Sequence, residues 1–235
     1  MSDPIRYRID IRRYKPGSID PARMQTFTVE RVDGRPHTVL DALERIRNVQ
    51  DGSLMYRHSC HHSACGTCAC TINGKPRLAC ITPLSAFEDG HVVLEPLQGF
   101  PCIGDLAVDM TAFFRRLDPQ WSCRRAERVD PCPESGAEPA AWLRFEDCIE
   151  CGCCVSACPE THGQSPFVGP AVLAALHRQY EKVPTQRPEL LAIAGGEAGV
   201  QWCRRALACS RVCPTRVYPA RHILQLQQLV EGKSE

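Results

Sequence analysis

Four cysteines and a proline define the stretch from Cys148 to Pro159, which reads CIECGCCVSACP. Its spacing, C-x2-C-x2-C-x3-C-P, is typical of the thiolate ligands of a 4Fe–4S cluster, and the fourth cysteine of such a run ligates a second cluster. Because four cysteines fall at the required positions, the pattern is highly specific for iron–sulfur ligation. It therefore predicts a second group of cysteines elsewhere in the chain.

The second group lies near the C-terminus, where Cys203, Cys209 and Cys213-Pro214 follow the pattern C-x2-A-x2-C-x3-C-P. Ala206 stands where the second cysteine of this pattern is expected. Exchange of the last cysteine between the two groups gives one complete set of four ligands for a 4Fe–4S cluster. That set is Cys148, Cys151, Cys154 and Cys213. The other set keeps three ligands, Cys158, Cys203 and Cys209.

The three-cysteine set predicts a 3Fe–4S cluster, in which one iron of the cube is missing, because the Ala206 side chain has no ligand atom. A 4Fe–4S cluster whose fourth iron is held by water or by another ligand is the alternative. The two hypotheses differ in what occupies the corner of the cube that a cysteine at position 206 would ligate.

A further group of four cysteines lies in the N-terminal half of the chain: Cys60, Cys65, Cys68 and Cys80. Their spacing, C-x4-C-x2-C followed by a distant fourth cysteine, matches that of a plant-type 2Fe–2S cluster. Small residues between them leave room for backbone N–H groups to turn toward sulfur, namely Ser63, Ala64, Gly66 and Thr67. Gly66 also tolerates a positive φ. A zinc site that uses the C-x2-C pair is the alternative, but a four-residue arm is unusual for zinc.

Sets of four, four and three ligands account for eleven of the 16 cysteines. The other five are Cys70, Cys102, Cys123, Cys132 and Cys153. Cys153 lies between ligands and is interpreted as a packed thiol. For Cys123 and Cys132, free thiols are favoured over a local disulfide or a second small metal site.

Length and charge exclude several classes of protein. The 235 residues are enough to bury a core without covalent staples, so the disulfide scaffold of a small secreted chain is not expected. Lys plus Arg number 28 and Asp plus Glu 27, which is not the basic excess of a nucleic-acid binder. We expect no signal peptide and no transmembrane segment, because no apolar run approaches the length of either.

Hydrophobic periodicity predicts an α+β domain over residues 1–105 and a mainly α-helical domain over residues 106–235. In the first domain, strands are expected at 5–11, 26–32, 70–72, 78–81 and 92–95, and a helix capped by Thr38 at 39–49. The Asn73-Gly74 pair predicts a tight hairpin turn. In the second domain, helices are expected at 109–117, 170–180, 201–208 and 219–230, and residues 118–140 are expected to form a loop.

Three clusters in one chain indicate an electron relay, because each cluster moves one electron at a time. The chain has neither the G-x-G-x-x-G fingerprint of a dinucleotide site nor a phosphate-binding P-loop. We therefore expect the two-electron chemistry at both ends of the relay to lie in partner proteins, and no substrate site in this chain.

The order of the three groups resembles that of the iron–sulfur subunit of succinate dehydrogenase and fumarate reductase, the succinate:quinone oxidoreductases. The resemblance covers nearly the whole chain. It rests on RHSC at 57–60, NG at 73–74, LAC at 78–80, DLAVD at 105–109, CIECGCC at 148–154 and FVGP at 167–170. The family implies an N-terminal β-grasp plant-type ferredoxin domain with the 2Fe–2S cluster, followed by an α-helical bacterial-type ferredoxin domain with the 4Fe–4S and 3Fe–4S clusters.

The resemblance also implies partners. A flavoprotein subunit with covalently bound FAD would oxidise succinate or reduce fumarate, and a membrane anchor would bind quinone and haem b. Electrons would pass between FAD and quinone through the 2Fe–2S, 4Fe–4S and 3Fe–4S centres. The chain itself would lie as a peripheral subunit on the cytoplasmic face of a prokaryotic inner membrane.

Other classes of protein could carry some of the same cysteine motifs. A soluble thiol-dependent fumarate reductase, or another flavin-linked dehydrogenase, would use the same relay with a different partner, but Ala206 and the short tail after Cys213 argue against it. A free ferredoxin carrier is expected to be smaller and strongly acidic. A structural zinc protein or thiol redox sensor would contain zinc and no acid-labile sulfide.

The sequence departs from the family pattern near the expected quinone site. Pro159 matches a position that the resemblance places near quinone. Arg204 occupies the place of a frequent histidine, and residues 160–165 lack a frequent tryptophan. The pattern is closer to fumarate reductases, or to forms in which an anchor haem takes the electron first. Because four cysteines already suffice in the first loop, His61 and His62 are interpreted as exposed residues rather than Rieske-type ligands.

Overall fold

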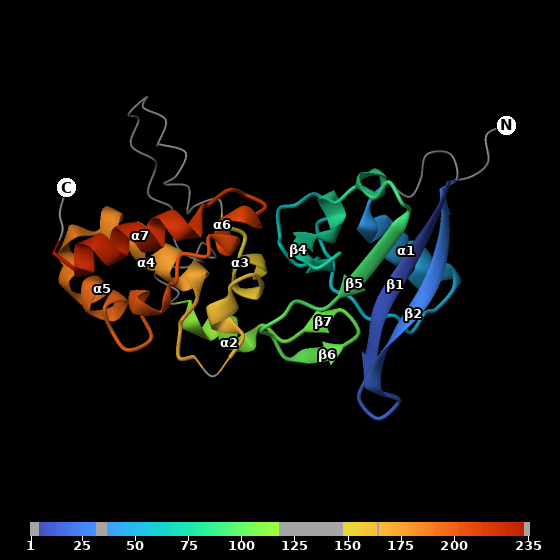
Figure 1. Ribbon diagram of the computed structural model, residues 1–235, viewed down its shortest axis with the longest axis horizontal. Helices are drawn as coiled ribbons and strands as arrows, with labels where there is room; N and C mark the ends of the chain where they lie inside the picture. The colour runs from blue at the N-terminus through green and yellow to red at the C-terminus, as the bar shows by residue number, and fades with distance from the viewer. Residues whose placement is uncertain (1–4, 32–36, 118–147, 164, 233–235) are drawn as a thin grey trace. The chain divides into compact units, whose positions relative to one another are not determined.

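The structure is a computed structural model, which describes residues 5–31, 37–117, 148–163 and 165–232 (Figure 1). The expected loop at 118–140, with Cys123 and Cys132, lies outside these ranges. The chain divides into two compact units, Met1–Met110 and Thr111–Glu235. The first unit continues past residue 105 because strand β6 (Cys102–Gly104) pairs with β7 (Ala107–Val108) across a turn at Asp105.

A mixed five-stranded sheet forms the frame of the first unit. Its strands are β1 (Ile5–Lys15), β2 (Ile19–Arg31), β3 (Ala69–Ile72), β4 (Lys75–Leu78) and β5 (His91–Glu95). They lie in the order β2-β1-β5-β3-β4. β1 is antiparallel to β2 and parallel to β5, and β3 is antiparallel to both of its neighbours. Alternating Tyr7, Ile9 and Ile11 of β1 are buried, which agrees with the period-two pattern of the sequence.

The helix expected at 39–49 is confirmed as α1 (Val39–Val49). Thr38 caps it: the Asp41 N–H donates to the Thr38 hydroxyl at 3.2 Å, and the Thr38 N–H donates back to the Asp41 carboxylate at 3.0 Å. This reciprocal capping box satisfies two backbone donors that a helix N-terminus otherwise leaves free. Leu43 and Ile46 then bury one face of the helix.

The return strand of the hairpin was expected at 78–81, but β4 ends at Leu78 and a 3₁₀ turn, η1 (Ala79–Ile81), follows. The chain leaves the ladder because it turns back onto the cysteine loop. The Ala79 N–H donates to the Cys68 carbonyl at 3.2 Å, and the Cys80 N–H donates to Cys68 Sγ at 3.4 Å.

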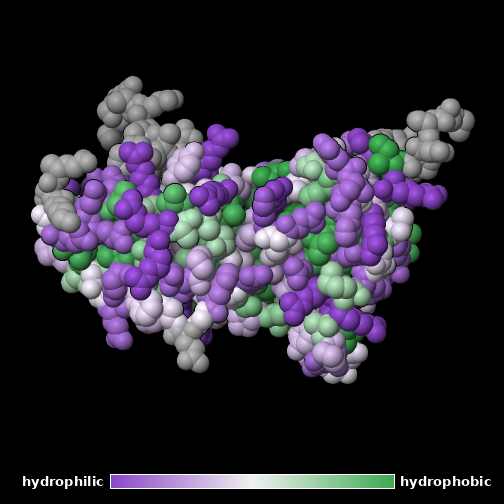
Figure 2. Space-filling view, viewed as in Figure 1, coloured by the Kyte–Doolittle hydropathy of each residue, from purple (hydrophilic) through white to green (hydrophobic). Residues whose placement is uncertain are grey.

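Helices make up the second unit. They are α2 (Thr111–Arg116), α3 (Cys153–Ser156), α4 (Pro170–Lys182), α5 (Arg187–Ala194), α6 (Ala208–Arg211) and α7 (Pro219–Val230). α4, α5 and α7 enclose an apolar core that includes Leu173, Leu190 and Leu226. None of the helices in the described ranges is long and apolar enough to cross a membrane. On the face seen in Figure 2, hydrophobic residues occur in small groups among hydrophilic ones.

The helix expected at 201–208 is wrong, and α5 was not anticipated. A 3₁₀ turn, η7 (Val200–Trp202), ends before Cys203, and α6 begins only at Ala208. Between them, Arg205 and Leu207 have φ values of 58° and 59°, in the left-handed region that a right-handed helix cannot include. The segment instead forms a loop around one of the cysteine sets.

Candidate metal centres

The first centre is a loop that directs backbone N–H groups toward cysteine sulfur. The Ala64 N–H donates to Cys60 Sγ at 3.3 Å, and the Thr67 N–H donates to Cys65 Sγ at 3.4 Å. Two of the four small residues that were expected to supply donors therefore do so. Left-handed backbone at Ser63 (φ 66°) and Gly66 (φ 69°) turns the loop tightly enough for these contacts. Cys68 lies beside Cys80, which comes from η1.

The thiols of this loop differ in acidity. Burial raises the pKa of Cys65, but hydrogen bonds from Thr67 and Cys60 outweigh this effect and lower it to about 6. Burial, together with the neighbouring Cys80 side chain, raises the pKa of Cys68 to about 12. Buried thiolates of like charge require cations between them, and the thiolate is the form that binds metal. The donor set therefore fits an iron–sulfur cluster.

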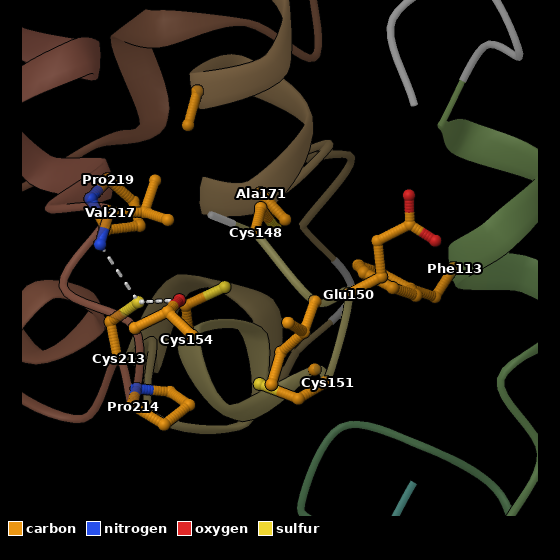
Figure 3. A pocket seen from close by; sticks show the side chains of 14 residues that line it. Phe113, Cys148, Glu150, Cys151, Cys154, Ala171, Cys213, Pro214, Val217 and Pro219 are labelled. Carbon is orange, nitrogen blue, oxygen red and sulfur yellow. Dashed lines mark hydrogen bonds between the residues drawn. The ribbon is translucent and has the colours of Figure 1, made fainter. Parts of the chain in front are cut away.

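The second centre is a pocket in the second unit that gathers Cys148, Cys151, Cys154 and Cys213. Figure 3 shows Cys151, Cys154 and Cys213 around this pocket, with the Val217 N–H donating to Cys213 Sγ at 3.3 Å. Burial raises the pKa of Cys154 well above its ordinary value, and the charges of Cys151 and Cys213 add to the increase. One pocket thus combines three cysteines of the first motif with the last cysteine of the second.

Val217 was not anticipated from the sequence as a sulfur donor. Its N–H reaches Cys213 because Pro214 follows the cysteine and Arg216 takes a left-handed φ of 59°. The sequence gives only a weak signal for this donor. A Cys-Pro pair indicates a turn, but it does not indicate which later N–H will donate to the sulfur.

The third centre is a separate pocket lined by Cys158, Cys203 and Cys209. Burial raises the pKa of Cys209 to about 11, and the charges of Cys158 and Cys203 add to this increase. Burial likewise raises the pKa of Cys158, with a contribution from Cys203. Ala206 lines the same pocket as these three cysteines, at the position where the motif has a fourth cysteine.

The remaining described cysteines are buried or bonded to the backbone. Cys153 is fully buried, and burial raises the pKa of Cys70 to about 12. The Cys102 thiol donates to the Asp105 carbonyl at 3.5 Å. None of the described cysteines forms a disulfide, and the burial of Cys153 agrees with its interpretation as a packed thiol.

Several other residues that the sequence singled out lie near the cysteine sets. His61 and His62 are exposed, as expected, and His62 Nδ1 contacts the Cys60 carbonyl. Pro159 is exposed and lines the three-cysteine pocket together with Arg204 and Arg205. His162, to which the sequence assigned no role, lies with Nε2 2.7 Å from the Ser156 carbonyl.

Comparisons with known proteins agree with these centres. Residues 8–115 match a family described as a 2Fe-2S iron-sulfur cluster binding domain, and residues 144–217 match a 4Fe-4S dicluster domain. Together with the sheet of the first unit and the helices of the second, these matches confirm the expected α+β class and its two ferredoxin-type domains.

Similar proteins span most of the chain. The fumarate reductase iron-sulfur subunit of Haemophilus influenzae is 33% identical over 233 residues, which cover 92% of this chain and 90% of that protein. The corresponding Mycobacterium tuberculosis subunit is 36% identical over 90% of this chain and 87% of its own length. A mitochondrial succinate dehydrogenase [ubiquinone] iron-sulfur subunit 1 from rice is 33% identical, covering 88% and 75%.

A solved structure also shares the fold. The Mycobacterium smegmatis Sdh1 complex in the apo form contains a chain that matches with a TM-score of 0.74. The match covers 98% of both chains at 24% sequence identity.

Proposed function

The chain belongs to the family of iron–sulfur subunits of fumarate reductases and succinate dehydrogenases, and from this membership we propose that it relays electrons through 2Fe–2S, 4Fe–4S and 3Fe–4S centres. The relay connects a flavoprotein subunit, which carries FAD and interconverts succinate and fumarate, with a membrane anchor that binds quinone. The chain acts as a peripheral subunit on the cytoplasmic face of a prokaryotic inner membrane. It is the electron-transfer subunit of an oxidoreductase whose substrate chemistry takes place on the flavoprotein subunit.

The observation that carries this proposal is the exchange of cysteines between two pockets. Cys213 lines the pocket of Cys148, Cys151 and Cys154, whereas Cys158 lines the pocket of Cys203 and Cys209. In two-cluster ferredoxins, the fourth cysteine of each run ligates the other cluster. A zinc site formed by one run alone would not require the runs to interleave.

We assign the ligands accordingly. The ligands of the 2Fe–2S cluster are Cys60, Cys65, Cys68 and Cys80. Those of the 4Fe–4S cluster are Cys148, Cys151, Cys154 and Cys213. Those of the 3Fe–4S cluster are Cys158, Cys203 and Cys209. When bound, these clusters supply one-electron redox chemistry.

The protein adjusts the reduction potentials of the clusters through burial and hydrogen bonds. N–H donors from Ala64, Thr67 and Val217 stabilise negative charge on sulfur, which favours the reduced form of the cluster. The low exposure of Cys68 and Cys151, 6% and 9%, limits contact of water with the ligating sulfur.

The quinone end of the relay is proposed beside the three-cysteine pocket. Pro159 is exposed there and lies in the same lining as Arg204 and Arg205. We propose that electrons pass between the last centre and the anchor through this exposed edge. Charged Arg204 and Arg205 suit contact with polar groups of the anchor or of lipid.

Electron paramagnetic resonance (EPR) on anaerobically purified protein tests the proposal. We expect a 3Fe signal in the oxidised state and two further cluster signals on stepwise reduction, with about nine iron atoms and about ten acid-labile sulfides per chain. Zinc without acid-labile sulfide would overturn the proposal.

A further inference from the structure

Three side chains outside the cysteine sets meet at the surface of the first unit: Glu44, His58 and His61. Each offers one ligand atom to the group. His58 Nδ1 lies 3.1 Å from His61 Nε2, and Glu44 Oε1 lies 3.5 Å from His61 Nε2 and 3.9 Å from His58 Nδ1. All three distances involve the same atom of each residue, so the atoms form one triangle.

The size of this triangle matches a transition-metal ion. The circle through the three atoms has a radius of about 2.0 Å, which is close to the usual Zn–N and Zn–O distances of about 2.0–2.2 Å. A zinc ion near the centre of the triangle would therefore reach all three atoms after shifts of only a few tenths of an ångström. Two imidazoles and one carboxylate are also a donor set that zinc takes in proteins.

Packing holds each donor in place. Glu44 lies on the capped helix α1, between the buried Leu43 and Ile46. The His58 ring lies 5.2 Å from the Tyr56 ring and, at a T-shaped angle of 81°, 5.2 Å from the His61 ring. His61 has a left-handed φ of 63°, a conformation that non-glycine residues adopt uncommonly. The helix thus fixes the backbone of Glu44, and the ring contacts bring the two imidazoles together.

The group is open on one side. The side chains of Glu44, His58 and His61 are 33%, 39% and 42% exposed. An ion bound there would have room for water as a fourth ligand, which is the arrangement of zinc sites with three protein ligands.

We propose that Glu44, His58 and His61 form a binding site for a divalent transition-metal ion of the zinc class, separate from the cysteine ligands. The site does not depend on the electron-relay assignment. Its rival is a hydrogen-bonded His58–His61–Glu44 chain that binds no ion.

Equilibrium dialysis distinguishes the two. Tag-free protein with its iron–sulfur clusters in place is dialysed anaerobically against zinc chloride, and zinc and iron per chain are counted by mass spectrometry. We expect one zinc ion per chain in addition to an unchanged iron content. Glu44→Gln, His58→Gln and His61→Gln should each weaken zinc binding at least tenfold, because each removes one of three ligands.

Matched controls use the same residue types outside the group. His37→Gln, His62→Gln and Glu88→Gln replace exposed residues and should bind zinc like the unmodified protein. Glu44→Gln is the decisive variant, because Glu44 lies on α1 and not in the cysteine loop; its reduced 2Fe–2S signal should be unchanged. Zinc uptake that equals a loss of iron, or unchanged binding by Glu44→Gln, would overturn the proposal.

Discussion

Arg13 and Asp105 form a buried ion pair, with Nε 3.0 Å from Oδ1 and side chains that are 1% and 0% exposed. Asp105 also accepts the Tyr14 N–H at 2.9 Å and the Met55 N–H at 2.8 Å. One carboxylate thus joins β1, the segment after α1 and the β6–β7 turn. The DLAVD sequence at 105–109, which supported the family resemblance, begins with this residue.

Replacement of Asp105 by Asn should destabilise the first unit by about 3 kcal/mol, because removal of one partner leaves a buried charge without its counterion. Arg13 keeps its second partner, Asp51, at 2.6 Å, and this remaining ion pair limits the loss of stability. Chemical denaturation followed by circular dichroism measures the change. Asp20→Asn, at an exposed carboxylate, is the control and should have little effect; equal stability of both variants would contradict the prediction.

Replacement of Ala206 by Cys should convert the third centre to a 4Fe–4S cluster, because a fourth thiol then lines the pocket of Cys158, Cys203 and Cys209. EPR of the oxidised protein should lose its 3Fe signal. Ala192→Cys adds a thiol at an exposed position of α5 and should leave the signal intact. If the oxidised-state signal persists in Ala206→Cys, the position has been misassigned.

The single substitutions Cys213→Ser and Cys158→Ser should each disturb a different cluster. Cys213→Ser removes a ligand from the pocket of Cys154, so the reduced 4Fe–4S signal should weaken or disappear while the 3Fe signal remains. Cys158→Ser should have the reverse effect. Cys153→Ala, at a buried thiol outside both sets, should keep both signals. If each run ligated its own cluster, the two serine variants would exchange phenotypes.

Acid should destabilise the second unit through His177 and His222, whose Nδ1 atoms lie 3.0 Å apart between α4 and α7. Burial, together with the charge of His222, lowers the pKa of His177 to about 4. Glu181 Oε1 lies 3.8 Å from His177 Nε2. Because the unfolded imidazole has a pKa near 6.5, the unfolded state binds a proton first. Stability should therefore fall as the pH decreases from about 6.5 to about 4, by up to about 3 kcal/mol.

Denaturation at a series of pH values measures this loss. His177→Gln should show a shallower decrease between pH 6.5 and 4, because the buried group then binds no proton. His62→Gln, at an exposed histidine, should keep the full slope. A slope that is identical in His177→Gln and the unmodified protein would show that other groups cause the acid sensitivity.

Local features of this protein were predictable from the sequence. The cap of α1 depends on Thr38 and Asp41, three residues apart, and Cys60, Cys65 and Cys68 lie on a single tight loop. Both patterns are set by neighbours in the chain, so backbone geometry alone determines them. The helix expected at 201–208 failed because Arg205 and Leu207 take left-handed conformations. No local preference of arginine or leucine indicates that conformation.

The sequence by itself predicted which cysteines group together and, through Ala206, that one set has three members. Tertiary structure alone decided that Arg13 meets Asp105, that His177 meets His222 and that Glu44 meets two histidines. These partners lie on separate elements, and the packing of β1 against β6, of α4 against α7 and of α1 beside the cysteine loop brings them together. Such contacts form only after whole helices and strands have packed their apolar faces together. The identities of the two contacting residues do not predict that packing.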